Sequence, residues 1–192
     1  MMDIKYSIKF HTDWHCGSGL AAGADVDALV VKDKDGLPFV PGKTMKGLVR
    51  EAMEDKMGLN GVESIDDKSD FVKAFGFFDD KEQKERGNMF FTNAELSKDE
   101  QKAIVSNNAA RFIYRSISST AIDDDGIAVE HSLRKMEVVV PCTLHGEIKN
   151  VPDNMADEVL DALRYIKRLG QNRNRGLGRC TIEDEKEGKN EN

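Results

Sequence analysis

The sequence is poor in cysteine, proline and tryptophan, and it lacks any long apolar run. Its 192 residues include three cysteines, four prolines and one tryptophan. The cysteines are odd in number, far apart and without a CxxC pair, which argues against a disulfide framework and against a cysteine-rich zinc site. The N-terminal residues alternate polar and apolar side chains, which supports neither a signal peptide nor a transmembrane helix. We therefore expect a cytoplasmic protein with no membrane partner.

A mixed zinc site is the one cysteine-containing metal site that the composition leaves open. Its ligands would be His15, Cys16, Cys142 and His145. The set requires the two strands that carry these residues to lie side by side, and adjacent residues on a strand point to opposite faces. The spacing therefore argues against this site.

The length and composition indicate one folded domain with a soluble surface. A hydrophobic content of 39% is adequate for a core, and 33% of the residues are charged. The tail EDEKEGKNEN, at 183–192, has no apolar anchor, so we expect it to be a disordered acidic segment. The folded body is then less acidic than the net charge of -7 suggests.

Glycine and arginine concentrate in one stretch near the C-terminus, GQNRNRGLGRC at 170–180. Glycine accepts positive φ and lets backbone approach a ligand closely, while arginine offers a planar fork to phosphate. No acidic residue lies between Arg164 and Arg179, although the whole chain is acidic. The stretch predicts a site for a polyanion. The alternative is a turn that ends a helix and carries solvated arginines.

A second basic motif begins the helix predicted over residues 44–57. Pro41 and Gly42 punctuate the chain before it, Thr44 is the expected cap, and Gly58 is placed to end it. Its expected core face comprises Met45, Leu48, Val49, Ala52 and Met53.

A different face of this helix carries Lys43, Lys46, Gly47 and Arg50. Glycine inside a helix costs about 1 kcal/mol relative to alanine, so we expect something to pack against the backbone at Gly47. That neighbour is either another protein element or a phosphate group. The basic side chains and the free N–H groups of a helix N-terminus favour phosphate.

The long periodic segments occur in the order strand, helix, strand, strand, helix, strand. They are predicted at 4–14, 44–57, 88–92, 136–149, 153–169 and 177–182. This βαββαβ order predicts an α+β, ferredoxin-like (RRM-like) core with an inserted lid and thumb hairpin. The insertions are expected at about 15–40, 58–87 and 117–135.

Shorter elements fill the rest of the chain. Strands are expected at 28–31 and 110–119, and a peripheral helix at 97–105. The acidic turn Asp123–Gly126 predicts a hairpin. Pro141, inside the long strand, predicts an edge position or a bulge.

Taken in order, the motifs resemble those of the RAMP superfamily of CRISPR-associated proteins. The matching segments are WHCGSG, VDALVVKDKDGLPFVPGKTMKGLVR, AFGFF followed by NMFFTNAEL, RSISSTAIDDDGIAVEHSLRKMEVVVPCTLHGEI and GQNRNRGLGRC. The most similar member is the repeating guide-RNA-binding backbone subunit of type III (Csm-like) effector complexes. The resemblance makes residues 1–182 a single RAMP domain.

The resemblance implies a subunit that stacks with copies of itself along the guide (CRISPR) RNA, beside other type III effector subunits. A complementary single-stranded RNA would pair with the guide, and the thumb would intrude between the two strands. The positions that match RNA contacts of the family are His15, Lys46, Arg50, Arg173 and Arg175.

The resemblance also implies a metal-dependent endoribonuclease. The family's catalytic aspartate, which works with a divalent cation, matches Asp27, and Asp25 is the near competitor. A carboxylate can hold a hydrated Mg²⁺ that activates a 2′-hydroxyl. One carboxylate makes a weak metal site, so substrate phosphates must complete it. Without the resemblance, an aspartate in a glycine-rich loop indicates a turn residue.

Three other functions fit the same sequence. One is a non-catalytic, structural RNA-binding RAMP subunit, and another is a generic single-stranded RNA binder outside CRISPR. The third is a metal-independent endonuclease that processes guide RNA, with His15 or His11 as general base.

Overall fold

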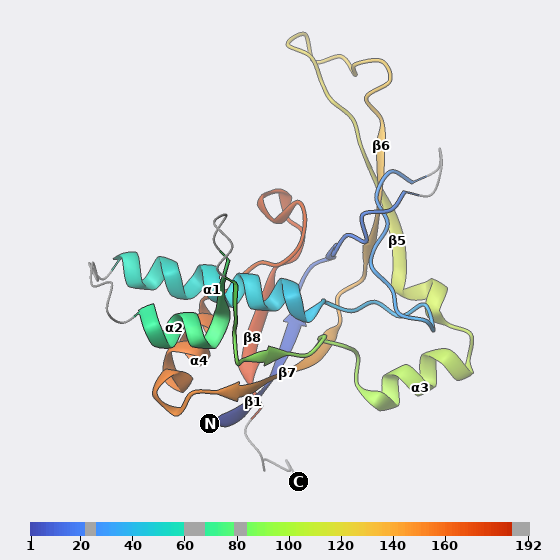
Figure 1. Cartoon of the computed structure of the whole chain (residues 1–192). Coiled ribbons are helices and arrows are strands. Elements are labelled where there is room, and N and C mark those ends of the chain that lie inside the picture. The colour runs from blue at the N-terminus through green and yellow to red at the C-terminus, as the bar shows by residue number, and fades with distance from the viewer. Residues whose placement is uncertain (22–25, 60–67, 79–83, 186–192) are drawn as a thin grey trace.

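The fold is organised around a four-stranded antiparallel sheet (Figure 1). This computed structural model describes residues 1–21, 26–59, 68–78 and 84–185. The strand order is β4-β7-β1-β8. The strands are β1 (Met2–Phe10), β4 (Phe90–Phe91), β7 (Thr143–Val151) and β8 (Cys180–Asp184). The third and first strands of the βαββαβ series are therefore central, which confirms the ferredoxin-like α+β class.

Two helices supply the apolar layer that the sheet needs. They are α1 (Gly42–Leu59) and α4 (Ala156–Tyr165), which contact each other as well as β4 and β8. In β1 the residues Ile4, Tyr6, Ile8 and Phe10 are buried, while the lysines between them are exposed. This alternation confirms the predicted half-buried strand. The predicted core face of α1 is confirmed as well, because four of its five members are buried and Leu48 packs against the core.

The strand predicted over 136–149 is wrong as a single element. The chain forms β6 (Arg134–Val139) and then β7, with Pro141 between them. Proline has no N–H to donate to a ladder, so the pairing stops there and the chain passes from one sheet to another. Strand β7 joins the main sheet, whereas β6 pairs with β5 (Tyr114–Ser119).

Strands β5 and β6 form the stem of a hairpin that projects from the body (Figure 1). The outer part ends in the acidic turn predicted at Asp123–Gly126. There Asp123 Oδ1 accepts hydrogen bonds from the N–H groups of Asp125 (3.1 Å) and Ile127 (2.8 Å), and Gly126 has φ +79°. The predicted hairpin is thus confirmed.

Several boundaries differ from the prediction. Residues 28–31 make isolated bridges rather than a strand, and 110–113 form a 3-10 turn. The apolar patch in the insertion expected at 58–87 is regular, forming α2 (Lys68–Phe75) and β2 (Gly76–Phe78), which pairs with β3 (Lys84–Arg86). The peripheral helix α3 (Lys98–Ser106) is confirmed, with a capping box between Ser97 and Glu100.

The ends of three elements also shift. Helix α1 begins at Gly42, whose N–H donates to Asn93 Oδ1 at 3.0 Å, so Thr44 lies inside the first turn and is not the cap. Helix α4 ends at Tyr165. Strand β8 continues to Asp184 by pairing with β1, which orders the start of the tail expected to be disordered. Residues 186–192 lie outside the described part. None of the described helices is long and apolar enough to cross a membrane.

Candidate nucleic-acid interface

The glycine-rich loop packs closely on the chain that follows β1. The Gln171 N–H donates to the carbonyl of His15 at 2.9 Å, and the Gly178 N–H donates to the carbonyl of Asp13 at 2.7 Å. Gly170 and Gly178 have φ of +95° and +67°, and a Cβ on either would overlap a backbone carbonyl, of His15 and Leu169 respectively. These glycines therefore admit the protein's own backbone, whereas the sequence interpretation assigned the close approach to a ligand.

This close approach predicts that two glycine substitutions differ in how much they lower the free energy of unfolding. Both Gly178 and Gly176 have positive φ, so alanine at either adds about 1–2 kcal/mol of backbone strain. A Cβ on Gly176 meets nothing within 4 Å, whereas one on Gly178 overlaps the Leu169 carbonyl. We expect Gly178→Ala to lower the free energy of unfolding by about 1–3 kcal/mol more than Gly176→Ala. Urea denaturation of the two variants measures this difference, and equal losses would contradict the packing described here.

The arginines of the loop point away from this packing. Arg173 and Arg175 lie in the short turn η4 (Arg173–Arg175), between Asn172 and Gly176, which have positive φ. Both residues are exposed, and their side chains form no hydrogen bond or ion pair with other described residues. Arg168 Nη1 donates to the Arg173 carbonyl at 2.8 Å and so stabilises the turn. Two predicted RNA-binding residues are thus available to an anionic ligand.

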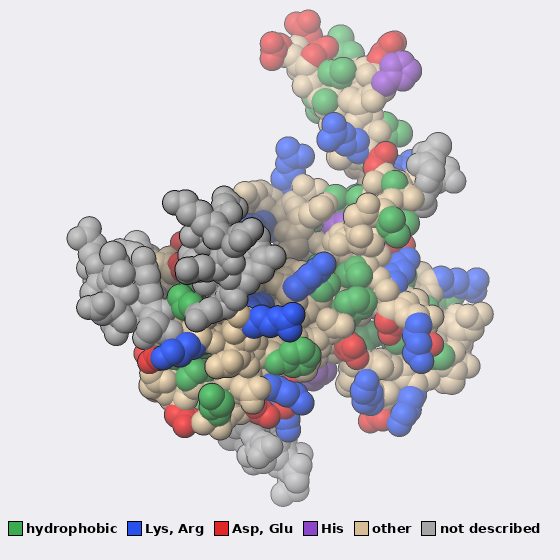
Figure 2. Space-filling model, in the orientation of Figure 1, with side chains coloured by type: hydrophobic (Ala, Val, Ile, Leu, Met, Phe, Trp, Pro, Cys, Tyr) green, Lys and Arg blue, Asp and Glu red, His purple; other side chains and the backbone are tan. Residues whose placement is uncertain are grey.

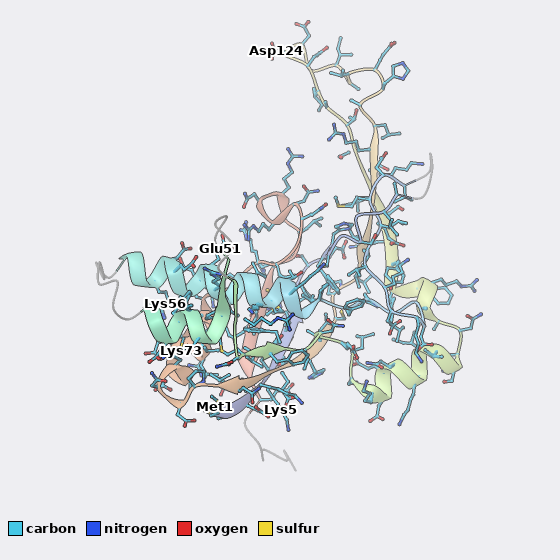
Figure 3. All side chains as sticks on the ribbon, viewed as in Figure 1. Met1, Lys5, Glu51, Lys56, Lys73 and Asp124 are labelled. Carbon is cyan, nitrogen blue, oxygen red and sulfur yellow. The ribbon has the colours of Figure 1, made fainter. Side chains whose placement is uncertain are left out.

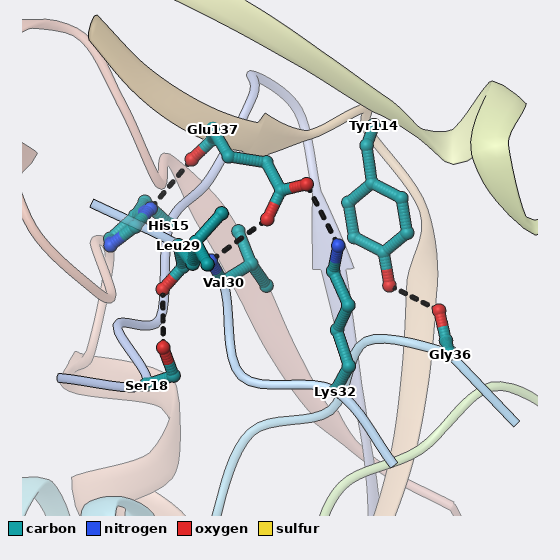
Figure 4. A network of polar contacts seen from close by, with 8 residues as sticks. All are labelled: His15, Ser18, Leu29, Val30, Lys32, Gly36, Tyr114 and Glu137. Atoms are coloured by element: carbon teal, nitrogen blue, oxygen red, sulfur yellow. Dashed lines mark hydrogen bonds and ion pairs between the residues drawn. The ribbon is translucent and has the colours of Figure 1, made fainter. Parts of the chain in front are cut away.

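His15 is placed differently from the prediction. Its side chain is fully buried, and Nδ1 lies 2.6 Å from the Glu137 carbonyl (Figure 4). A carbonyl only accepts, so this bond assigns the ring proton to Nδ1. Nε2 is buried and has no hydrogen-bond partner in the part of the chain that the structure describes. A buried ring offers no surface to RNA, so the structure contradicts a direct contact; His15 instead links β6 to the glycine-rich loop.

The basic face of α1 is only partly free. Lys46 is half-buried, and burial, with the nearby charge of Arg50, lowers its pKa. The Arg50 guanidinium is already engaged, because Nε lies 2.8 Å from Glu54 Oε1 and the group sits 5.7 Å from the centre of the Phe71 ring. Gly47 is exposed, and a Cβ there would have no described neighbour within 4 Å. Close packing of another described element therefore does not explain this glycine.

Charge is distributed unevenly over the molecule. Figure 2 shows lysine and arginine side chains on the face that carries α1, and a group of acidic side chains at the tip of the hairpin. The tip includes Asp124, far from the body of the protein (Figure 3). Since phosphate is repelled by carboxylates, the acidic tip is a solvated surface rather than a phosphate site.

Asp27 lies beside the outer end of the β5–β6 stem. Its N–H donates to the Lys135 carbonyl at 2.9 Å, and its Oδ2 accepts from the Lys135 N–H at 2.7 Å. The residue as a whole is exposed. Asp25 lies outside the described residues.

The described residues form no self-sufficient metal site. Among them no three His, Cys, Asp or Glu side chains gather in a way that could hold a metal ion, and this includes the mixed set of His15, Cys16, Cys142 and His145. Burial raises the pKa of the Cys142 thiol to about 11, which disfavours the thiolate that zinc requires. Asp27 fits a cation only if RNA phosphates supply further ligands.

The residues that hold the Asp27 segment were missed by sequence reasoning. Glu137 bonds to the Val30 N–H and to Lys32, and Lys32 lies 4.0 Å from the centre of the Tyr114 ring (Figure 4). The signal was present in MEVVV, where an acid interrupts an apolar run. A second missed pair joins Arg115 of β5 to buried Asp13, with Nε 2.6 Å from Oδ2.

These observations define a class of protein: a ferredoxin-like α+β domain with a basic glycine-rich loop at one end and a projecting hairpin beside it. The chain belongs to the RAMP superfamily, whose family model matches residues 7–181. The predicted superfamily is thus confirmed. No curated protein sequence matches the chain.

Two solved structures share the fold over nearly the full length. One is a chain in the cryo-EM structure of the type III-B Cmr-β complex in the apo state, with a TM-score of 0.73 and 14% identity, covering 97% of this chain and 98% of that one. The other is from type III-B Cmr-β bound to cognate target RNA, with a TM-score of 0.71 and 11% identity, covering 96% and 97%. Both come from a Cmr complex, whereas the sequence motifs most resemble a Csm-like subunit. At this identity the likeness concerns the fold.

Proposed function

We propose that this chain is a guide-RNA-binding backbone subunit of a type III CRISPR effector complex, and that it cuts complementary RNA with Asp27 and a divalent cation. Membership of the RAMP superfamily and the fold shared with chains of a type III-B complex support the first part. The position of Asp27 supports the second. The partners are guide RNA, complementary single-stranded RNA, further copies of the chain and other type III subunits, in the cytoplasm.

One arrangement carries the proposal. The chain after β1 is held between the glycine-rich loop, through Gln171, and β6, through the ring of His15. The glycine-rich loop that carries the arginines and the β6 strand that holds Asp27 are therefore both hydrogen-bonded to the same residue, His15. A guide strand on Arg173 and Arg175 then lies at a set position relative to the hairpin and to Asp27, as cutting at fixed intervals requires.

For RNA cleavage, the main task of the chain would be to position the cation and the two RNA strands. Asp27 would hold the cation with its free oxygen while Lys135 fixes the other. A bound Mg²⁺ offsets charge on the phosphate and lowers the pKa of an attacking hydroxyl. The arginines of the loop orient the guide, and the target is oriented through base pairing.

A structural subunit without cleavage is the second candidate. It is favoured by the absence, among the described residues, of any group of three or more His, Cys, Asp or Glu side chains that could hold a metal ion. A histidine-dependent nuclease has less support, because His15 is buried and His11 Nε2 bonds to Thr181 Oγ1 at 2.7 Å.

The test is cutting of complementary RNA by guide-loaded assemblies in Mg²⁺ and in chelator. We expect regularly spaced cuts in Mg²⁺, none in chelator, and unchanged target binding in both. Binding without cuts in either condition would leave the structural subunit. Cuts that persist in chelator would contradict metal-dependent cleavage and would favour a nuclease that uses a histidine.

A further inference from the structure

Few backbone hydrogen bonds join the segment that carries Asp27 to β6. Asp27 and Lys135 exchange two hydrogen bonds, and the Glu137 N–H donates to the Ala28 carbonyl at 3.0 Å. The ladder then stops. The next acceptor on β6, the Glu137 carbonyl, is taken by the ring of His15.

Beyond the last backbone hydrogen bond, the side chain of Glu137 connects the segment to β6. Its Oε2 accepts from the Val30 N–H at 3.0 Å, and its Oε1 pairs with Lys32 Nζ at 2.8 Å (Figure 4). Val30 is 2% exposed and the Glu137 side chain 15% exposed. A buried amide needs an acceptor, and the half-buried Glu137 carboxylate supplies it.

We propose that Glu137 is a positioning residue for Asp27, acting through the Val30 amide. This inference rests on the proposed function of Asp27. Removing the carboxylate leaves the Val30 N–H buried without an acceptor, three residues from the carboxylate that would hold the cation. The segment between them then loses its hydrogen bond to β6 beyond Ala28. Leu29 remains bonded to Ser18 and Leu20 on the other side. A carboxylate misplaced by about 1 Å reduces a rate by roughly 100-fold.

The same change should spare guide binding. Lys46 belongs to α1, and Arg173 and Arg175 belong to the glycine-rich loop, so none of them contacts the Glu137 side chain. His15 touches only the backbone carbonyl of Glu137, which every substitution retains. The expected defect is therefore in the cutting rate at saturating target.

Three variants separate the two roles of the Glu137 side chain, which are to accept the Val30 hydrogen bond and to carry a negative charge. Glu137→Ala removes both, and Glu137→Gln keeps an amide oxygen that can accept from Val30. Lys32→Met removes the ion pair but leaves the carboxylate in place. In single-turnover assays with guide-loaded assemblies, we expect Glu137→Ala to cut roughly 100-fold more slowly. The other two variants should cut within about threefold of the unmodified protein, since the Val30 bond survives in both.

Hydrogen exchange of the Val30 amide gives a second reading that does not depend on cutting. It should accelerate in Glu137→Ala and remain near the unmodified rate in Glu137→Gln. A Glu137→Ala variant that cuts normally, or a Glu137→Gln variant that fails equally, would overturn the inference. If the unmodified assembly does not cut, the proposed function fails, and equal exchange in all variants would remove the anchoring role too.

Discussion

Replacing Asp27 with alanine should abolish cutting of complementary RNA by the guide-loaded assembly while guide and target remain bound. The carboxylate of this exposed residue is the chain's proposed contribution to the cation site, with one oxygen held by the Lys135 N–H. Metal stabilisation of a transition state amounts to several kcal/mol, so we expect a loss of roughly 1,000-fold in single-turnover rate. Binding should persist because Asp27 is exposed and is not one of the basic residues proposed to hold RNA.

Two further variants make the result specific. Asp27→Asn retains an oxygen that can accept from the Lys135 N–H but carries no charge, so it should be as inactive as the alanine variant. Asp124→Ala removes an equally exposed carboxylate at the tip of the hairpin and should cut at the unmodified rate (Figure 3). Full activity in Asp27→Asn would show that the carboxylate charge is unnecessary. Full activity in Asp27→Ala would direct attention to Asp25.

The parts of the fold that depend on local periodicity could be predicted. The alternation of Ile4, Tyr6, Ile8 and Phe10 specifies a strand with one buried face, and the apolar spacing of α1 specifies its core side. The division into two strands could not, because Pro141 indicates an edge position or a bulge as readily as a break, and the residues on both sides of it are strand-like. Which sheet each half joins is decided by its partner, which is the other arm of the hairpin, β5, for the first half and the distant β1 for the second.

The candidate site shows the same limit at the level of single residues. His15 is a polar residue in a glycine-rich segment, and only the carbonyl of Glu137, 122 positions away, explains its burial. The pairing of Arg50 with Glu54 follows from helical spacing, but its contact with Phe71 does not. The glycines of the loop mark close approach, yet the sequence contains no sign of whether the approaching group is RNA or the protein itself.

Arg173 and Arg175 therefore emerge as the strongest predicted contacts to RNA, with Arg50 as a natural comparison. We expect the double variant Arg173→Ala/Arg175→Ala to bind single-stranded guide RNA at least about 100-fold more weakly, because each charge-assisted hydrogen bond contributes about 1.5–3 kcal/mol. The slope of log K against log salt should fall by about 1.4, since each contact to single-stranded phosphate contributes about 0.7.

Arg50→Ala should leave that slope nearly unchanged, because Glu54 already neutralises the guanidinium at 2.8 Å and Phe71 covers it. Its effect should appear in stability instead, as α2 loses a contact with α1. Filter binding of the full chain between 50 and 200 mM salt measures both slopes under the same conditions. A double variant with unchanged affinity and slope would show that the glycine-rich loop does not face RNA, and a large slope change in Arg50→Ala would place the guide along α1.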